Sequence, residues 1–277
     1  MLHSIQLKHD NETLGRGYHS VMPKIILTYV LIFSTGSFYL DSAYAKSSHD
    51  SCNGKEIYAT KAFNIKMVRD NVSDEEITRM ANESNIHAML WLASKYNLGN
   101  GVKKDKDKAR KWTLKAAQHG SGEAKVSLAF YYPEKPQTSG PFRMTDSELK
   151  WLKQAADEGY VYAQLMMAWH YTGDTGTDVR APADFEQVTK WLLLAAKNGC
   201  ADAQYGLGQF YLRGKSVGLS NKQAYMWYLI GSEIDSSYDE KQMKDIKTGL
   251  EKNLKKTEID TARDEANQWL AKFKQKQ

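Results

Sequence analysis

Cysteine is scarce in this 277-residue chain, which has only Cys52 and Cys200. Two cysteines cannot build a four-cysteine zinc site or the dense disulfide framework of a small secreted scaffold. The HExxH, CxxC and G-x-S-x-G motifs are absent too, so zinc-hydrolase and nucleophile-elbow chemistry lack support. The stretch GQFYLRGKS, residues 208–216, has Gln209 where a phosphate-binding loop needs glycine. The sequence therefore favours a non-enzymatic protein, with no cofactor and no metal.

Long blocks of one charge are also few. The formal net charge of +5 is mildly basic, and only the Lys103–Lys111 loop and the C-terminal tail concentrate Lys and Arg. A nucleic-acid binder normally combines a basic stripe with aromatic residues that stack on bases. We therefore interpret the charge as solvated surface and expect no nucleic-acid partner.

The first 45 residues predict an export signal peptide. Lys24 precedes the apolar run Ile25–Phe33, and Ala43-Tyr44-Ala45 has the small-residue spacing that signal peptidase prefers. The run is too short and too poorly flanked for a membrane span. We expect cleavage near Ala45, with Met22 as an alternative start, and a mature chain that is periplasmic or secreted. No stable membrane insertion is expected after cleavage.

One nine-residue phrase recurs three times, as WTLKAAQHG from Trp112, WLKQAADEG from Trp151 and WLLLAAKNG from Trp191. Trp at one turn and paired Ala at the next form a ridge beside a notch, so a neighbouring helix can approach closely. The closing Gly ends the helix by taking the left-handed conformation at little cost. The phrase therefore predicts the second helix of a two-helix unit.

A first helix precedes each phrase. Tyr recurs eight residues after each of four anchors, Ala88, Ala124, Ala163 and Ala203. Leu or Met at +4 and Ala or Gly at +5 share one helix face with it. The second helices have N-cap residues at Asp105, Thr145, Asp184 and Ser220, and Glu148 and Gln223 complete two capping boxes. A closing helix with one apolar stripe begins at Thr257 and suits a cap over the stack.

These residues resemble the Sel-one-like repeat family, which is related to the tetratricopeptide repeats. The stretch 88–120 carries most of the family phrase: Tyr96, Gly99, Gly101, Val102, Asp105, Lys108, Ala109, Trp112, Lys115, Ala116 and Ala117. The resemblance covers about residues 73–235. It implies an all-α fold, a right-handed α/α superhelix or solenoid of about four helix pairs, usually a scaffold or adaptor for other proteins. Residues 46–72 would be an N-terminal tail, and residues 236–277 C-terminal capping helices.

Two insertions and the two cysteines bear on where a partner binds. The extra residues of the second and third units lie in Pro133–Phe142 and Thr172–Ala183, which are either binding loops or neutral drift. A Cys52–Cys200 disulfide requires the tail to run back along the stack, which about twenty extended residues could reach at ~3.3 Å each. Whether the two are bridged stays open. If they are, the tail occupies the concave groove and limits what else binds there.

By analogy with tetratricopeptide repeats, the first helices line the concave surface through columns at −1, +2 and +6 from each anchor Ala. The aromatic side chains there, together with Arg213, which extends the last stripe, predict a partner-binding patch: Phe130, Tyr162, Trp169, Tyr205 and Arg213. They could instead fill a tightly wound core. The expected partner is another protein, either a secreted toxin that this chain neutralises as an immunity protein or an envelope protein that it serves as an adaptor. The alternative is β-lactam hydrolysis, as in cysteine-rich repeat relatives, but those place a disulfide in every repeat.

Overall fold

The computed structural model describes residues 50–132, 144–172, 183–214, 218–235 and 240–275. The chain divides into two compact units, Met1–Phe38 and Tyr39–Gln277, and every described residue belongs to the second. The predicted signal peptide and the inserted loop Pro133–Phe142 lie outside the described residues, as does most of Thr172–Ala183.

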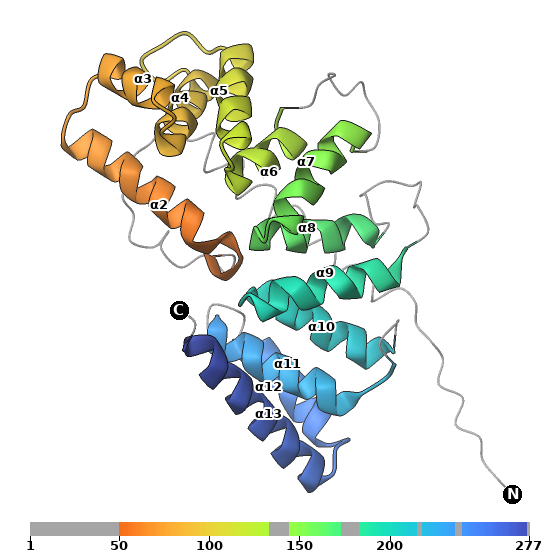
Figure 1. The fold of residues 1–277 in the computed structure, drawn as a ribbon. Coiled ribbons are helices and arrows are strands. Elements are labelled where there is room, and N and C mark those ends of the chain that lie inside the picture. Colours follow the sequence, from red (N-terminus) through yellow and green to blue (C-terminus); the bar gives the residue numbers. More distant parts are fainter. Residues whose placement is uncertain (1–49, 133–143, 173–182, 215–217, 236–239, 276–277) are drawn as a thin grey trace, which may run out of the picture. The chain divides into compact units, whose positions relative to one another are not determined.

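The described residues form twelve helices and no strand. The helices are α2 (Asp50–Arg69), α3 (Asp74–Asn82), α4 (Ile86–Leu98), α5 (Lys106–Gln118), α6 (Gly122–Phe130), α7 (Asp146–Asp157), α8 (Val161–Tyr171), α9 (Phe185–Lys197), α10 (Ala201–Arg213), α11 (Asn221–Ile234), α12 (Glu240–Glu251) and α13 (Lys256–Lys274). From α3 to α11 each helix packs against the next one along the chain (Figure 1). Contacts between sequence neighbours are what define a solenoid. The all-α solenoid expected from the sequence is therefore confirmed.

The recurrent phrase forms the second helix of each pair, as predicted. Helices α4, α6, α8 and α10 are the first helices, and α5, α7, α9 and α11 are the second helices. The paired alanines of the phrase are all buried, because the neighbouring helices approach there. The closing glycines Gly120, Gly159 and Gly199 have φ of 95°, 92° and 88°. These left-handed angles stop the helices where the sequence indicated.

The helix caps also follow the sequence, with one exception. Asp105, Asp184 and Thr145 cap their helices, and Thr145 completes a capping box with Glu148. Ser220 accepts a hydrogen bond from the backbone of Gln223, but the Gln223 side chain does not return it. Its amide nitrogen lies 3.4 Å from Glu265 on α13 instead. The expected second capping box is therefore only half formed.

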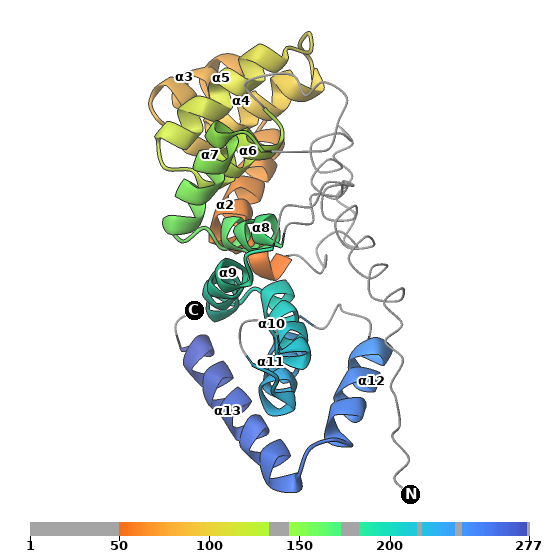
Figure 2. The ribbon, with the colours of Figure 1, turned by 90° about the vertical axis from the view of Figure 1, so that its right-hand side faces the viewer.

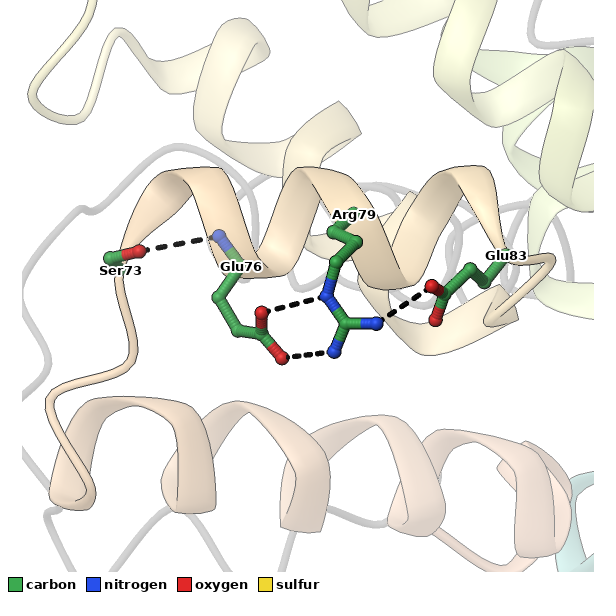
Figure 3. A network of polar contacts seen from close by, with 4 residues as sticks. All are labelled: Ser73, Glu76, Arg79 and Glu83. Carbon is green, nitrogen blue, oxygen red and sulfur yellow. Dashed lines mark hydrogen bonds and ion pairs between the residues drawn. The ribbon is translucent and has the colours of Figure 1, made fainter.

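Helix α3 belongs to an incomplete first unit, and its polar side chains satisfy one another (Figure 3). Ser73 caps the backbone N–H of Glu76 at 3.2 Å. Arg79 then makes a two-pronged contact with Glu76, at 2.6 and 2.9 Å, and reaches Glu83 at 2.7 Å. The network lies on the exposed side of α3, where such pairs add little to stability.

The C-terminal end is covered by α12 and α13, both of which contact α11 (Figure 2). The closing helix begins at Lys256, one residue before the position predicted from sequence. A Cβ placed on Gly199 would lie 2.2 Å from the ring of Phe273 on α13. Only glycine therefore allows the closing helix to approach the end of α9 this closely.

Candidate functional site: the inner face of the solenoid

Helix α2 lies against the first helices α4, α6, α8 and α10 (Figure 1). We call the side that these four helices present to it the inner face. The tail, which the sequence analysis pictured as extended, is a helix of 20 residues. Such a helix is about 30 Å long, which matches three steps of the stack at about 10 Å each. The tail therefore spans the stack: its helix begins beside α10 and reaches α4 further along the chain.

A disulfide between Cys52 and Cys200 fastens the start of α2 to the start of α10. The two residues are 148 positions apart in sequence, and both are fully buried. The bond closes a large loop that contains most of the repeats. In this structure the tail occupies the inner face, the arrangement that a bridged pair requires.

A buried hydroxyl holds the middle of α2. Thr60 Oγ1 donates a hydrogen bond to Oε2 of Glu123 at 3.1 Å. Nδ1 of His87 lies 3.1 Å from the same Thr60 Oγ1. A hydroxyl has one proton, so Nδ1 of His87 must carry a hydrogen and donate it to Thr60. The ring of His87 also lies 5.8 Å from that of Phe63 on α2. These contacts join α2 to α4 and α6 at once.

Three residues that lie beside α2 share one position in the repeat, because His87, Glu123 and Asp202 each precede an anchor Ala. Tyr162 holds the same position on α8, and we call the four residues the −1 edge. Of these four residues, the sequence analysis predicted a role for Tyr162 alone, and it assigned none to His87 or Thr60. The sequence did contain a signal for the buried face of this helix, because Cys52, Thr60 and Met67 are spaced by eight and seven residues. That spacing puts them on one face of a helix, and all three are buried.

Asp202 lies beside the disulfide and raises the question of a metal. One carboxylate oxygen of Asp202 and the sulfur atoms of Cys52 and Cys200 all lie within 4.8 Å of one another. Metal ions bind the thiolate form of cysteine, and both sulfurs are used in the bond to each other. The trio in its bridged form therefore supplies a single anionic ligand and does not fit a metal.

The five residues predicted to bind a partner fall into two groups. Tyr162 and Tyr205 are each 5% exposed, so neither is open to a partner. The ring of Tyr205 lies 6.0 Å from that of Tyr228 on the second helix α11. Burial raises the pKa of Tyr162, and Tyr131 and Asp202 add to the shift. Phe130 and Trp169 are half-buried and Arg213 is exposed. They lie at the last turns of α6, α8 and α10, with Phe130 and Trp169 at +6 and Arg213 at +10 from the anchor Ala, and we call these three the +6 edge.

These observations define a class of protein, a helical-repeat solenoid whose inner face is partly filled by its own N-terminal helix. The Sel1 repeat family matches residues 86–121, 149–160, 161–200 and 201–235. The matched stretches begin at α4 and end with α11, as the repeat columns do. The chain is therefore a Sel1-repeat protein.

Two curated proteins and two solved structures show the breadth of this similarity. The chain is 27% identical over 141 residues to a sel1-like repeat-containing protein of Acanthamoeba polyphaga mimivirus, covering 51% of this chain and 24% of that one. It is 30% identical over 151 residues to a chitin synthase regulator of Saccharomyces cerevisiae, covering 53% and 21%. The chain thus spans about a quarter or less of the curated relatives that it matches.

The two solved structures share the fold. One is a protective antigen of uropathogenic Escherichia coli that displays an SLR fold, with a TM-score of 0.57 and 22% identity, covering 79% of this chain and 46% of that one. The other is a Sel1 repeat protein from Oxalobacter formigenes, with a TM-score of 0.52 and 21% identity, covering 78% and 99%. At these identities the likeness shows the fold alone.

Proposed function

We propose that the mature chain is a non-enzymatic protein-binding module of the bacterial envelope, exported by residues 1–45 and cleaved near Ala45. The observation that carries this proposal is the position of α2. A solenoid whose inner face packs a helix along its whole length has a surface suited to helical or extended segments of other proteins. The resident α2 fills the −1 edge, so a partner uses the rest of the face.

The +6 edge is the proposed contact surface. Phe130 and Trp169 are half-buried, and Arg213 is an exposed residue. Trp and Arg are the residue types that most often dominate binding energy at protein interfaces. Tyr162 and Tyr205 are buried and are not part of the proposed contact surface.

Two roles in the envelope are candidates, an immunity protein and an adaptor, and the disulfide that fixes α2 favours the first. A disulfide that fixes a helix across four repeats stiffens the surface before any partner arrives. Preorganised surfaces lose less entropy on binding and reach higher affinity, which suits an immunity protein that neutralises a secreted toxin. The second candidate is an adaptor that binds an envelope protein, for which the Sel1 repeats themselves are the supporting observation. A β-lactam hydrolase is not proposed, because the single disulfide does not repeat.

A comparison of two tryptophan variants tests the proposal. Tagged mature chain, residues 46–277, is used to capture partners from envelope extract and the captured proteins are quantified by mass spectrometry. Trp169→Ala removes the ring at the +6 edge. Trp151→Ala is the matched control, because Trp151 is also half-buried but lies on α7, a second helix.

The proposal expects one stoichiometric partner that Trp169→Ala loses and Trp151→Ala keeps. The partner's own activity then separates the two roles: a toxin identifies an immunity protein, and an assembly factor identifies an adaptor. Equal loss in both variants, with circular dichroism unchanged, would contradict the assignment of the +6 edge. Recovery of the chain from the cytoplasmic fraction with residues 1–45 still attached would contradict the proposed export.

A further inference from the structure

The whole net charge of the chain is concentrated in one short segment. Residues 103–115 contain seven Lys and Arg against two Asp, a net charge of +5. The formal net charge of all 277 residues is also +5. The rest of the chain is therefore balanced, and this segment alone makes the protein basic.

The fold arranges these cations as a stripe on α5. Lys108, Lys111 and Lys115 follow one another on α5 at intervals of three and four residues, the spacing of one helix face. Lys104 lies in the segment just before the helix, and we count it with them as the cationic stripe. Lys104, Lys108 and Lys111 are exposed and Lys115 is half-buried. The buried side of α5 is made by Ala109, Thr113, Ala116 and Ala117, on the opposite face. From Lys108 to Lys115 the helical part of the stripe is about 10 Å long.

This arrangement is locally unfavourable. Lys106 and Lys108 stand in the first turn of α5, where the helix dipole favours anions. Lys111 follows Lys108 by three residues and precedes Lys115 by four, and like charges at these spacings destabilise a helix. Sequences that contradict local preferences tend to do so at functional sites.

The chain compensates the stripe only in part. Lys108 Nζ lies 3.8 Å from Asp105 and 5.1 Å from the ring centre of Tyr96, and Lys115 Nζ lies 4.3 Å from that of Trp112. Within the described residues, no ion pair neutralises Lys104 or Lys111. Two exposed charges of the stripe are thus left for something outside the chain.

The composition of the stripe points to the kind of surface that it meets. Protein interfaces are built on buried aromatic and aliphatic anchors and are depleted in Lys. The large apolar side chains exposed in the described residues are Ile65, Val68, Leu194 and Leu219, and none is on α5. Lysine ammonium groups on flexible stems attract phosphate without fixed geometry, as basic segments do at anionic membranes.

We propose that the cationic stripe docks the protein on an anionic phospholipid surface. Contact is peripheral: no helix in the described part of the chain is long and apolar enough to cross a membrane. Because the stripe lies on a second helix, docking leaves the first-helix side available to a protein partner. The biological setting rests on the proposed export, but lipid binding itself does not.

Vesicle co-flotation of the mature chain tests this proposal. Vesicles of equal parts phosphatidylglycerol and phosphatidylcholine are compared with pure phosphatidylcholine at low ionic strength. We expect binding to the anionic vesicles alone, and release as salt rises. Each Lys near such a surface contributes roughly a factor of five, so Lys104→Gln/Lys108→Gln/Lys111→Gln should weaken the partition coefficient on the order of 100-fold.

A matched variant controls for net charge. Lys244, Lys252 and Lys256 are also exposed. They lie on α12, in the turn after it and at the start of α13, and changing all three to Gln removes the same charge far from the stripe in sequence. This control should lose far less than the stripe variant. Equal losses in both variants, or equal binding to neutral vesicles, would overturn the proposal.

Two further arms distinguish other anions. A random-sequence DNA duplex that binds as tightly as the anionic vesicles would overturn the assignment to lipid. Inorganic phosphate should compete no better than sodium chloride of the same ionic strength, and stronger competition would indicate a site for free phosphate. If the stripe variant loses lipid but still captures its protein partner, the two proposals are separated.

Discussion

Replacing both Cys52 and Cys200 by Ser removes the disulfide that fastens the start of α2 to α10. The chain-entropy account of disulfides depends on the size of the loop that the bond closes. With 148 residues between the two cysteines, it gives about 5 kcal/mol. Natural disulfides usually deliver about 2–4 kcal/mol, because the unfolded chain retains some structure. We expect a loss in that range for the double variant.

The loss should be uneven along the chain. Without the disulfide, α2 is held by Thr60, its contacts with His87 and Glu123, and the burial of Met67. The helix pairs behind it keep all their contacts with each other. Amide hydrogen exchange followed by mass spectrometry should therefore show α2 exchanging much faster in the variant, with α8 and α9 close to wild type.

Urea unfolding of the same variant gives the global free energy of unfolding. Reduction of the wild-type protein by a dithiol should reproduce the variant, and the dithiol should leave the variant itself unchanged. An unchanged urea midpoint together with unchanged exchange of α2 would refute the reasoning. That result would mean that noncovalent packing alone fixes α2 on the inner face.

Three further changes test individual contacts. Thr60→Val should cost roughly 1–3 kcal/mol in urea unfolding, because it leaves buried polar partners unpaired; no loss would contradict the role of its hydroxyl. Gly199→Ala should cost about 1–3 kcal/mol, from the left-handed φ and the clash with Phe273, and Phe273→Ala in the same background should recover the clash part of that loss. The hydrogen bond from Lys125 lowers the pKa of Glu158 below its ordinary 4.5. The stability that this pair gives the folded protein is therefore full above pH 4.5 and is lost as the pH falls through the lowered pKa. Lys125→Met should flatten the loss of stability below pH 4.5, and an unchanged acid limb would contradict the pairing.

Much of the fold was predictable because each repeat uses local rules. The phrase that ends at Gly120, Gly159 and Gly199 combines a packing notch with a helix stop, and both depend on neighbours in sequence. The caps at Asp105 and Thr145 are equally local. Repetition supplied the rest, since four copies of one spacing identify helix faces that a single copy would leave ambiguous.

The site was less predictable because it depends on a contact across 148 residues. Helix α2 lacks the repeat pattern, so its register on the inner face could not be counted from the anchors. The buried Tyr162 and Tyr205 stand at −1 and +2 from their anchors, whereas the half-buried Phe130 and Trp169 stand at +6. The sequence alone did not reveal which of these columns neighbouring helices cover. The capping box at Gln223 was mispredicted for a similar reason. Its side chain contacts Glu265 on the closing helix, which is distant in sequence.

Site-specific photo-crosslinking in living cells tests the central claim most directly. A photoreactive amino acid at position 169 places the probe on the +6 edge, and the same amino acid at position 151 places it on a second helix. The account predicts one crosslinked protein adduct at position 169, formed in the envelope fraction and absent at position 151. An adduct at position 151 alone, or none at either position, would contradict a partner-binding inner face.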